Sequence, residues 1–167
     1  MTSIKQLCGI AVTALLISLT GCDKNQVESS IVGTWTAVSQ QHYAKGKLWK
    51  EMNYEKQEET YYYEGEAVET KAFPEAFTLT MTEDGKYVGI IEVNDESGSG
   101  TEQEKGTYEV VKKGSDLYIS YMNEDGNNQE MQVTALSDHL LKLQVKDEKA
   151  SIDGTSLDYT VVYTFKR

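Results

Sequence analysis

The sequence has little arginine, histidine and cysteine, and each shortage excludes a class of site. Only one of the 16 basic residues, Arg167, is an arginine, which excludes a cluster of arginines for bidentate binding of phosphate. The 27 acidic residues give a net charge of −11, and such a chain repels nucleic acid and anionic lipid headgroups. His42 and His139 are the only histidines, and neither has a second ligand at metal spacing. We therefore predict no metal site and no nucleic-acid partner, and we expect both histidines to lie on the surface.

Motifs for catalysis are also lacking. The sequence contains no Gly-X-Ser-X-Gly elbow, no phosphate-binding loop and no activated cysteine. Residues 123–128 resemble a calcium loop in composition, but Gly126 stands at the fourth position rather than the sixth, so we interpret them as a hairpin turn. Carboxylate pairs such as Glu102 and Glu104 arise by chance among 27 acidic residues. We predict that the protein is not an enzyme, has no catalytic residue and needs no cofactor.

The amino-terminal segment has the three parts of a secretory signal. Lys5 lies in a short polar start, residues 7–19 form an apolar run, and the sequence Leu-Thr-Gly-Cys ends at Cys22. The run of 13 residues is shorter than the roughly 20 that a membrane-spanning helix needs. The four-residue pattern closely resembles the signal of bacterial lipoproteins. The alternative is a core helix that happens to end in a cysteine.

This resemblance implies a lipid anchor. It predicts a diacylglyceryl thioether on Cys22, removal of the signal peptide 1–21 and acylation of the new amino terminus by a fatty acid such as palmitate. The protein would then lie in the bacterial cell envelope, attached to a membrane, with the outer membrane favoured and the face left open. Since Cys8 leaves with the signal and Cys22 carries lipid, no thiol remains for a disulfide. Residues 22–30 contain only Val27 as a large apolar residue and predict a flexible tether.

Residues 31–167 form one domain whose sequence predicts strands. Phe77, Leu79 and Met81 alternate with threonines, which is the period of two that a half-buried strand requires. Asp84 and Gly85 then predict a tight hairpin turn. The acidic stretch 94–102, rich in Gly and Ser, predicts a loop. Eight strands follow from this pattern, at residues 34–40, 77–82, 87–93, 106–111, 117–122, 131–136, 140–146 and 159–165.

Strands joined by short turns pair with their neighbours in antiparallel order. Eight such strands can close into an up-and-down barrel, which removes the exposed sheet edges. An eight-stranded barrel is filled by its side chains or holds one small ligand. The fold class is therefore all-β, with a two-sheet β-sandwich as the alternative, because both folds bury one face of each strand.

Several short motifs resemble lipocalins. Gly33, Thr34 and Trp35 match the Gly-X-Trp signature on the first strand of that family, and the order of later motifs up to Arg167 is similar to the lipocalin-like lipoproteins of Bacteroidetes. The resemblance implies a barrel that binds a small, mostly apolar ligand. It also implies a structural pair, in which Trp35 packs at the closed end of the barrel and Arg167 covers it.

The inward positions of the strands, together with aromatic residues of the long segment after the first strand, give the candidate ligand-binding residues. They are Trp49, Tyr54, Tyr62, Phe77, Leu79, Met81, Tyr108, Ile119, Tyr121, Val133, Tyr159 and Tyr163. The alternation also directs Leu117, Met131, Leu143 and Val161 inward, and the same residues are needed merely to fill a core.

Residues 41–74 depart from the simple pattern. Leu48, Trp49 and Met52 have helical spacing, whereas the tyrosine run 61–63 and Val68 favour an extended hairpin, so the local structure stays open. In lipocalins this place holds a lid loop, and we expect the aromatic residues to border the open end, the alternative being that they cover the side of the barrel. An alternative function follows, a non-catalytic interaction module that binds an envelope protein or glycan, or inhibits an enzyme.

Overall fold

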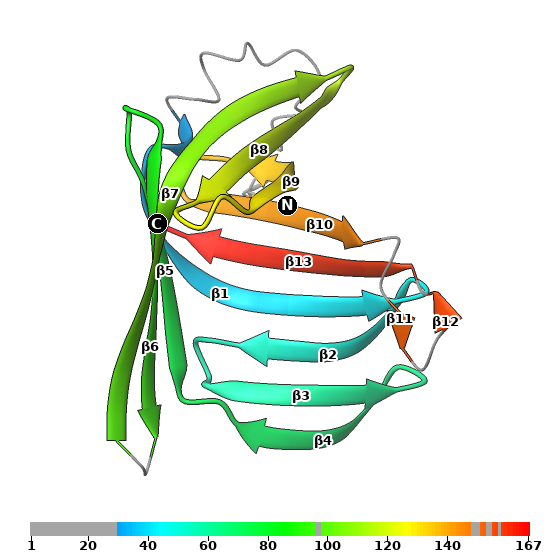
Figure 1. Ribbon diagram of the computed structural model, residues 1–167. Helices are drawn as coiled ribbons and strands as arrows, with labels where there is room; N and C mark the ends of the chain where they lie inside the picture. Colours follow the sequence, from blue (N-terminus) through cyan, green and yellow to red (C-terminus); the bar gives the residue numbers. More distant parts are fainter. Residues whose placement is uncertain (1–29, 96–97, 148–150, 153–154, 157) are drawn as a thin grey trace, which may run out of the picture.

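The computed structural model describes residues 30–95, 98–147, 151–152, 155–156 and 158–167. Eight antiparallel strands form a closed barrel in which β13 pairs with β1 (Figure 1). They are β1 (Gly33–Ala44), β5 (Glu75–Met81), β6 (Lys86–Asp95), β7 (Gly98–Lys113), β8 (Asp116–Asn123), β9 (Asn128–Leu136), β10 (Leu140–Asp147) and β13 (Tyr159–Lys166). Each matches one of the eight predicted strands, so the all-β prediction is confirmed. The predicted signal peptide and all but the last residue of the predicted tether lie outside the described residues.

The long strand β1 decides between barrel and sandwich. Its first residues, Gly33 to Thr36, pair with β5, and residues from Thr36 to Ala44 pair with β13. Thr36 has Thr78 on one side and Lys166 on the other, so the ring of eight strands closes at this point. The two-sheet alternative is therefore wrong. Among the described residues, no helix is long and apolar enough to cross a membrane.

Residues 41–74 continue β1 and then form three further strands, β2 (Lys47–Asn53), β3 (Glu58–Tyr63) and β4 (Glu66–Ala72). They add to the second half of β1, beyond the point where β5 leaves it, so β1 to β4 lie side by side while β5 and β6 run across them (Figure 1). The helical alternative for this segment is wrong. Two-residue turns with positive φ at both positions, 45–46 and 64–65, fix these hairpins.

The predicted loop at 94–102 is also wrong. Strands β6 and β7 stay paired up to Asn94 with Ser99 and Asp95 with Gly98. The described side chains from Gly98 to Lys105 are exposed, so Gly and Ser lose no packing there, and the hydrogen-bond ladder simply continues from the buried part of the hairpin. A short hairpin of β11 (Ser151–Ile152) and β12 (Thr155–Ser156), which the sequence did not predict, lies between β10 and β13.

One end of the barrel is closed by a packed core around Trp35. The indole is fully buried and donates a hydrogen bond from Nε1 to the Ile31 carbonyl at 2.8 Å. The Arg167 guanidinium carbon lies 4.0 Å from the centre of the indole, and its Nη2 donates to the carbonyls of Ser30 and Val32. A Cβ on Gly33 would approach the guanidinium to 3.3 Å, and φ at this residue is +133°. The Gly-X-Trp sequence thus provides the space in which the arginine lies.

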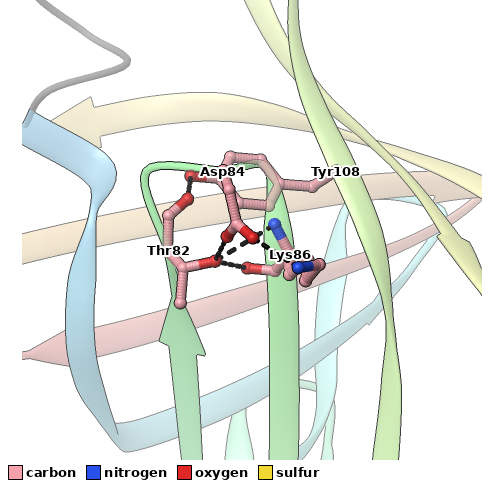
Figure 2. A network of polar contacts seen from close by, with 4 residues as sticks. All are labelled: Thr82, Asp84, Lys86 and Tyr108. Atoms are coloured by element: carbon pink, nitrogen blue, oxygen red, sulfur yellow. Dashed lines mark hydrogen bonds and ion pairs between the residues drawn. The ribbon is translucent and has the colours of Figure 1, made fainter.

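A polar network fixes the β5–β6 turn near this core (Figure 2). Thr82 and Lys86 both bind the Asp84 carboxylate, and the Tyr108 hydroxyl of β7 donates to the Thr82 carbonyl at 2.8 Å. The hydrogen bonds from Lys86 and Thr82 lower the pKa of Asp84, so its carboxylate stays ionised and keeps these hydrogen bonds. The carbonyl of Gly85, whose φ is +74°, accepts from the backbone N–H of Tyr108 at 2.7 Å. Strand β7 is therefore held in register against the predicted Asp-Gly turn.

Candidate ligand-binding site

A cavity of about 350 Å³ lies inside the barrel. Strand alternation directs its lining inward, because residues two apart along each strand face the same side of the sheet. The lining residues are Gln40, Tyr54, Phe77, Leu79, Met81, Tyr87, Gly89, Ile91, Glu102, Gln103, Glu104, Tyr108, Ile119, Tyr121, Met131, Leu143, Tyr163 and Phe165. Trp35 and Ile31 are not among them, so the cavity lies beyond the closed end.

Eight of the twelve candidate ligand-binding residues line this cavity. They are Tyr54, Phe77, Leu79, Met81, Tyr108, Ile119, Tyr121 and Tyr163. Met131 and Leu143, which the alternation also directs inward, line it too. The structure therefore brings most of the predicted inward face of the barrel together around one space.

The other four candidates lie elsewhere. Val133 is 3% exposed and belongs to the packed core. Trp49 and Tyr159 lie with His42 in an aromatic cluster on β1, β2 and β13, with the His42 ring 5.9 Å from each of the other two rings. Tyr62 donates from its hydroxyl to Glu51 at 3.2 Å, away from the cavity. Trp49 and Tyr62 lie on β2 and β3, outside the closed ring of eight strands, and alternation within a strand cannot reveal which strands form that ring.

His42 is half-buried, so the prediction that it lies on the surface is wrong. Its Nδ1 shares a hydrogen bond with the Tyr159 hydroxyl, and its Nε2 shares one with the side chain of Gln40. Burial, and then the positive charge of Lys50, lower its pKa to about 4. His42 is therefore neutral at physiological pH. His139 is exposed in the β9–β10 turn.

The aromatic residues required by the interaction-module alternative are mostly covered. Tyr63 is 70% exposed, whereas Trp49, Tyr61 and Tyr62 are half-buried. Tyr54 donates from its hydroxyl to Gln40 at 3.1 Å and faces the cavity. Of these aromatic residues, Tyr54 borders the cavity, while the others cover the strands of the extension.

The residues that the sequence did not predict lie mainly on β6 and β7. They are Gln40, Tyr87, Gly89, Ile91, Glu102, Gln103, Glu104 and Phe165. The period of two would have found Tyr87, Gly89 and Ile91, because they alternate within a predicted strand. Glu102 lay in the stretch assigned to a loop, and its inward direction becomes visible only once β7 extends through that stretch.

The strand register sets a row of positions across the wall of the cavity. Leu79 lies opposite Gly89, and Gly89 lies opposite Glu104. A Cβ on Gly89 would approach the Phe77 ring to 3.3 Å, so the absent side chain leaves room for that ring. The ring of Phe77 and the carboxylate of Glu104 can therefore face the same space.

The polar atoms of the lining are phenols, amides and carboxylates. The Tyr87 hydroxyl donates to Glu104 at 2.9 Å, and the Tyr121 hydroxyl donates to Gln129. Burial raises the pKa of Tyr54, Tyr87, Tyr121 and Tyr163, so all four phenols stay protonated and act as hydrogen-bond donors. Within the described part of the chain, no group of three potential metal ligands is present. The arrangement suits non-covalent binding.

Comparisons with known proteins add little to this geometry. No family model matches the chain, and no curated protein matches it. The chain is similar to a crystal structure of lobster apocrustacyanin A1, with a TM-score of 0.41 and 11% sequence identity, over 90% of this chain and 71% of that one. The fold assignment depends on the strand pairing described above.

Proposed function

We propose that the protein binds a small, mostly apolar molecule inside the barrel, as a lipid-anchored component of the bacterial cell envelope. The cavity is the observation that supports ligand binding. Protein interiors are close-packed, with few voids larger than one water molecule. About 350 Å³ has room for on the order of ten waters of about 30 Å³ each. This volume also falls within the range of about 300–1,000 Å³ that is typical of ligand pockets.

The lining supports an apolar ligand with one polar end. Phe77, Leu79, Met81, Ile119 and Phe165 offer apolar side chains, and the tyrosines add broad ring faces. Water in contact with such walls makes few hydrogen bonds, so an apolar molecule that displaces it is favoured. The few polar groups of the lining, among them Gln40 and Glu104, would orient the bound molecule.

The anchor is proposed from the sequence around Cys22, which lies outside the described residues. The domain is held from Ser30 onward, because the Ser30 carbonyl accepts from Arg167 and Ile31 is fully buried. A tether from Cys22 to Ser30 spans at most about 30 Å when extended at ~3.3–3.6 Å per residue. The barrel would therefore lie close to the membrane that carries the lipid.

A matched pair of variants tests ligand binding. Ile91 and Glu92 are neighbours on β6, but Ile91 lines the cavity and Glu92 is exposed. We expect Ile91→Trp to fill the cavity and abolish binding of a neutral naphthalene probe, measured by the rise in probe fluorescence. Glu92→Trp should bind the probe as the natural chain does. Absence of binding to the natural chain, or equal binding by both variants, would contradict the proposal.

The anchor has its own test. Cells that express the chain are fed an alkyne-tagged palmitate, and the purified protein is examined for the tag after coupling to a dye. We expect the natural chain to carry the label and to fractionate with membranes, whereas Cys22→Ser should be unlabelled. A natural chain without label would rule out the anchor and leave the binding proposal untouched.

A further inference from the structure

The charged groups around the cavity all have one sign. On β7, Glu102 and Glu104 share the inner face with Tyr108 and the buried Val110, because residues an even number of positions apart on a strand face the same side. Glu75 begins β5 on the face that also carries Phe77. Among the described residues, no lysine, arginine or histidine lines the cavity. The interior thus offers carboxylates without a cation.

A hydrogen bond from a phenol fixes the Glu104 carboxylate at the rim of the cavity, where Glu102 and Glu104 are also exposed to solvent. The Glu104 carboxylate accepts the hydroxyl of Tyr87, a residue that is only 5% exposed. Its charge also raises the pKa of Tyr121 on the adjacent strand β8, after burial and the influence of Tyr163. One hydrogen bond occupies one of roughly four acceptor positions of a carboxylate, so Glu104 retains capacity to bind a ligand.

Glu75 and Glu102 lie on the same wall of the barrel, on β5 and β7, with β6 between them. Burial, and then the negative charge of Glu102, raise the pKa of Glu75. The positive charge of Lys50 acts on Glu75 in the opposite sense, but Lys50 forms its ion pair with Glu59. Two carboxylates that repel each other on one wall are stabilised by a cation bound near both of them.

Aromatic rings form much of the remaining lining. Tyr54, Tyr87, Tyr121 and Tyr163 line the cavity, and the Phe77 ring lies beside Gly89. The faces of such rings attract cations, and they attract ammonium groups most strongly where water is excluded. Carboxylates at one end and rings along the wall form a site for an organic cation.

We infer that the ligand of this cavity is an organic amine, an apolar molecule whose protonated nitrogen binds Glu102 and Glu104 at the mouth. This inference rests on the proposed function, because it describes the polar end of the molecule bound in the same cavity. An anionic amphiphile such as a fatty acid is disfavoured, since its carboxylate would meet the two carboxylates of the lining, where no described lysine, arginine or histidine lies. A charge-assisted hydrogen bond is shorter and stronger than a neutral one, so the ammonium group gains affinity over a hydroxyl.

Three probes of equal shape test the inference on the purified full chain by isothermal titration calorimetry. They are phenylbutylammonium, phenylbutanol and phenylbutyrate, which differ only in the polar end. We expect the ammonium to bind at least tenfold more tightly than the alcohol, a difference of about 1.4 kcal/mol, and the carboxylate to bind most weakly. Binding of the alcohol as tight as that of the ammonium would overturn the inference and leave the proposed function standing. If none of the three binds, both fail.

Variants of β7 assign the effect to the two carboxylates. In the double variant Glu102→Gln, Glu104→Gln we expect the preference for the ammonium over the alcohol to disappear. Glu109→Gln is the matched control, because Glu109 lies on the same strand, is exposed and faces away from the cavity. It removes one negative charge and should preserve the preference. A preference that survives in the double variant, or falls equally in the control, would assign the effect to overall charge and overturn the inference.

Discussion

Removal of the Arg167 side chain should weaken the closed end of the barrel. The guanidinium carbon lies 4.0 Å from the centre of the Trp35 ring, and Nη2 donates to two carbonyls, at 3.0 Å to Ser30 and 2.9 Å to Val32. These carbonyls lie just before β1, so the arginine ties the chain entering the barrel to its last strand. Arg167→Ala breaks all three interactions and uncovers one face of a fully buried indole.

The size of the loss follows from these contacts. A cation over an indole contributes ~0.5–2 kcal/mol, and a net hydrogen bond about 0.5–1.5 kcal/mol, with charged donors at the upper end. Because Arg167 itself is exposed, we take values near the middle and expect a loss of about 2–4 kcal/mol in the free energy of unfolding. At roughly 3–4 °C per kcal/mol for a domain of this size, the melting temperature should fall by about 6–16 °C.

Urea unfolding followed by circular dichroism measures this loss, and Lys166→Ala is the control. Lys166 is the adjacent basic residue, and its ion pair with Glu55 is about half exposed on both sides, so its removal should cost ~0–1 kcal/mol. Arg167→Lys keeps the charge but not the planar group, so its loss in the free energy of unfolding should lie between those of Arg167→Ala and Lys166→Ala. Equal losses for Arg167→Ala and Lys166→Ala would refute the stabilising role of the arginine.

Two further predictions concern one glycine and one histidine. Gly106→Ala places a Cβ 2.0 Å from the Met122 carbonyl oxygen and should lower the free energy of unfolding by about 3 kcal/mol or more. Gly100→Ala on the same strand meets nothing within 4 Å and should lower it by under ~1 kcal/mol. Equal urea midpoints for the two variants would contradict this. Because burial lowers the pKa of His42 to about 4, the unfolded chain binds a proton that the folded chain does not, so stability falls as pH drops from about 6.5 toward 4. In His42→Gln the loss between pH 7 and pH 5 should be smaller by about 1 kcal/mol, after allowance for partial exposure, and His139→Gln should retain the natural profile.

The strands could be predicted because their signal is local. Alternation of Phe77, Leu79 and Met81 with threonines requires one buried face wherever the strand lies, and the Asp84–Gly85 turn needs only its own two residues. The sequence predicts a loop at 94–102, because Gly and Ser have low strand propensity. A hairpin already paired at its buried end overrides that propensity.

Part of the candidate site could be predicted for the same reason. Alternation placed Phe77, Leu79 and Tyr163 on the inner face, and they line the cavity. It could not separate a lining residue from a core residue such as Val133, since both point inward. Nor could it place Trp49 and Tyr62, because they lie on β2 and β3, which extend the sheet outside the closed ring of eight strands.

The order and composition of the residues are enough to predict most of the strands, the apolar face of each and the surplus of negative charge, because these are local properties. The pairing of β13 with β1, the extension of the sheet by 41–74 and the space left inside become visible in the folded chain. Closure and cavity volume depend on contacts between residues far apart in the chain. The position of the Glu102 and Glu104 carboxylates at the cavity depends on such contacts too, because it follows from the pairing of β7 with β6 and β8.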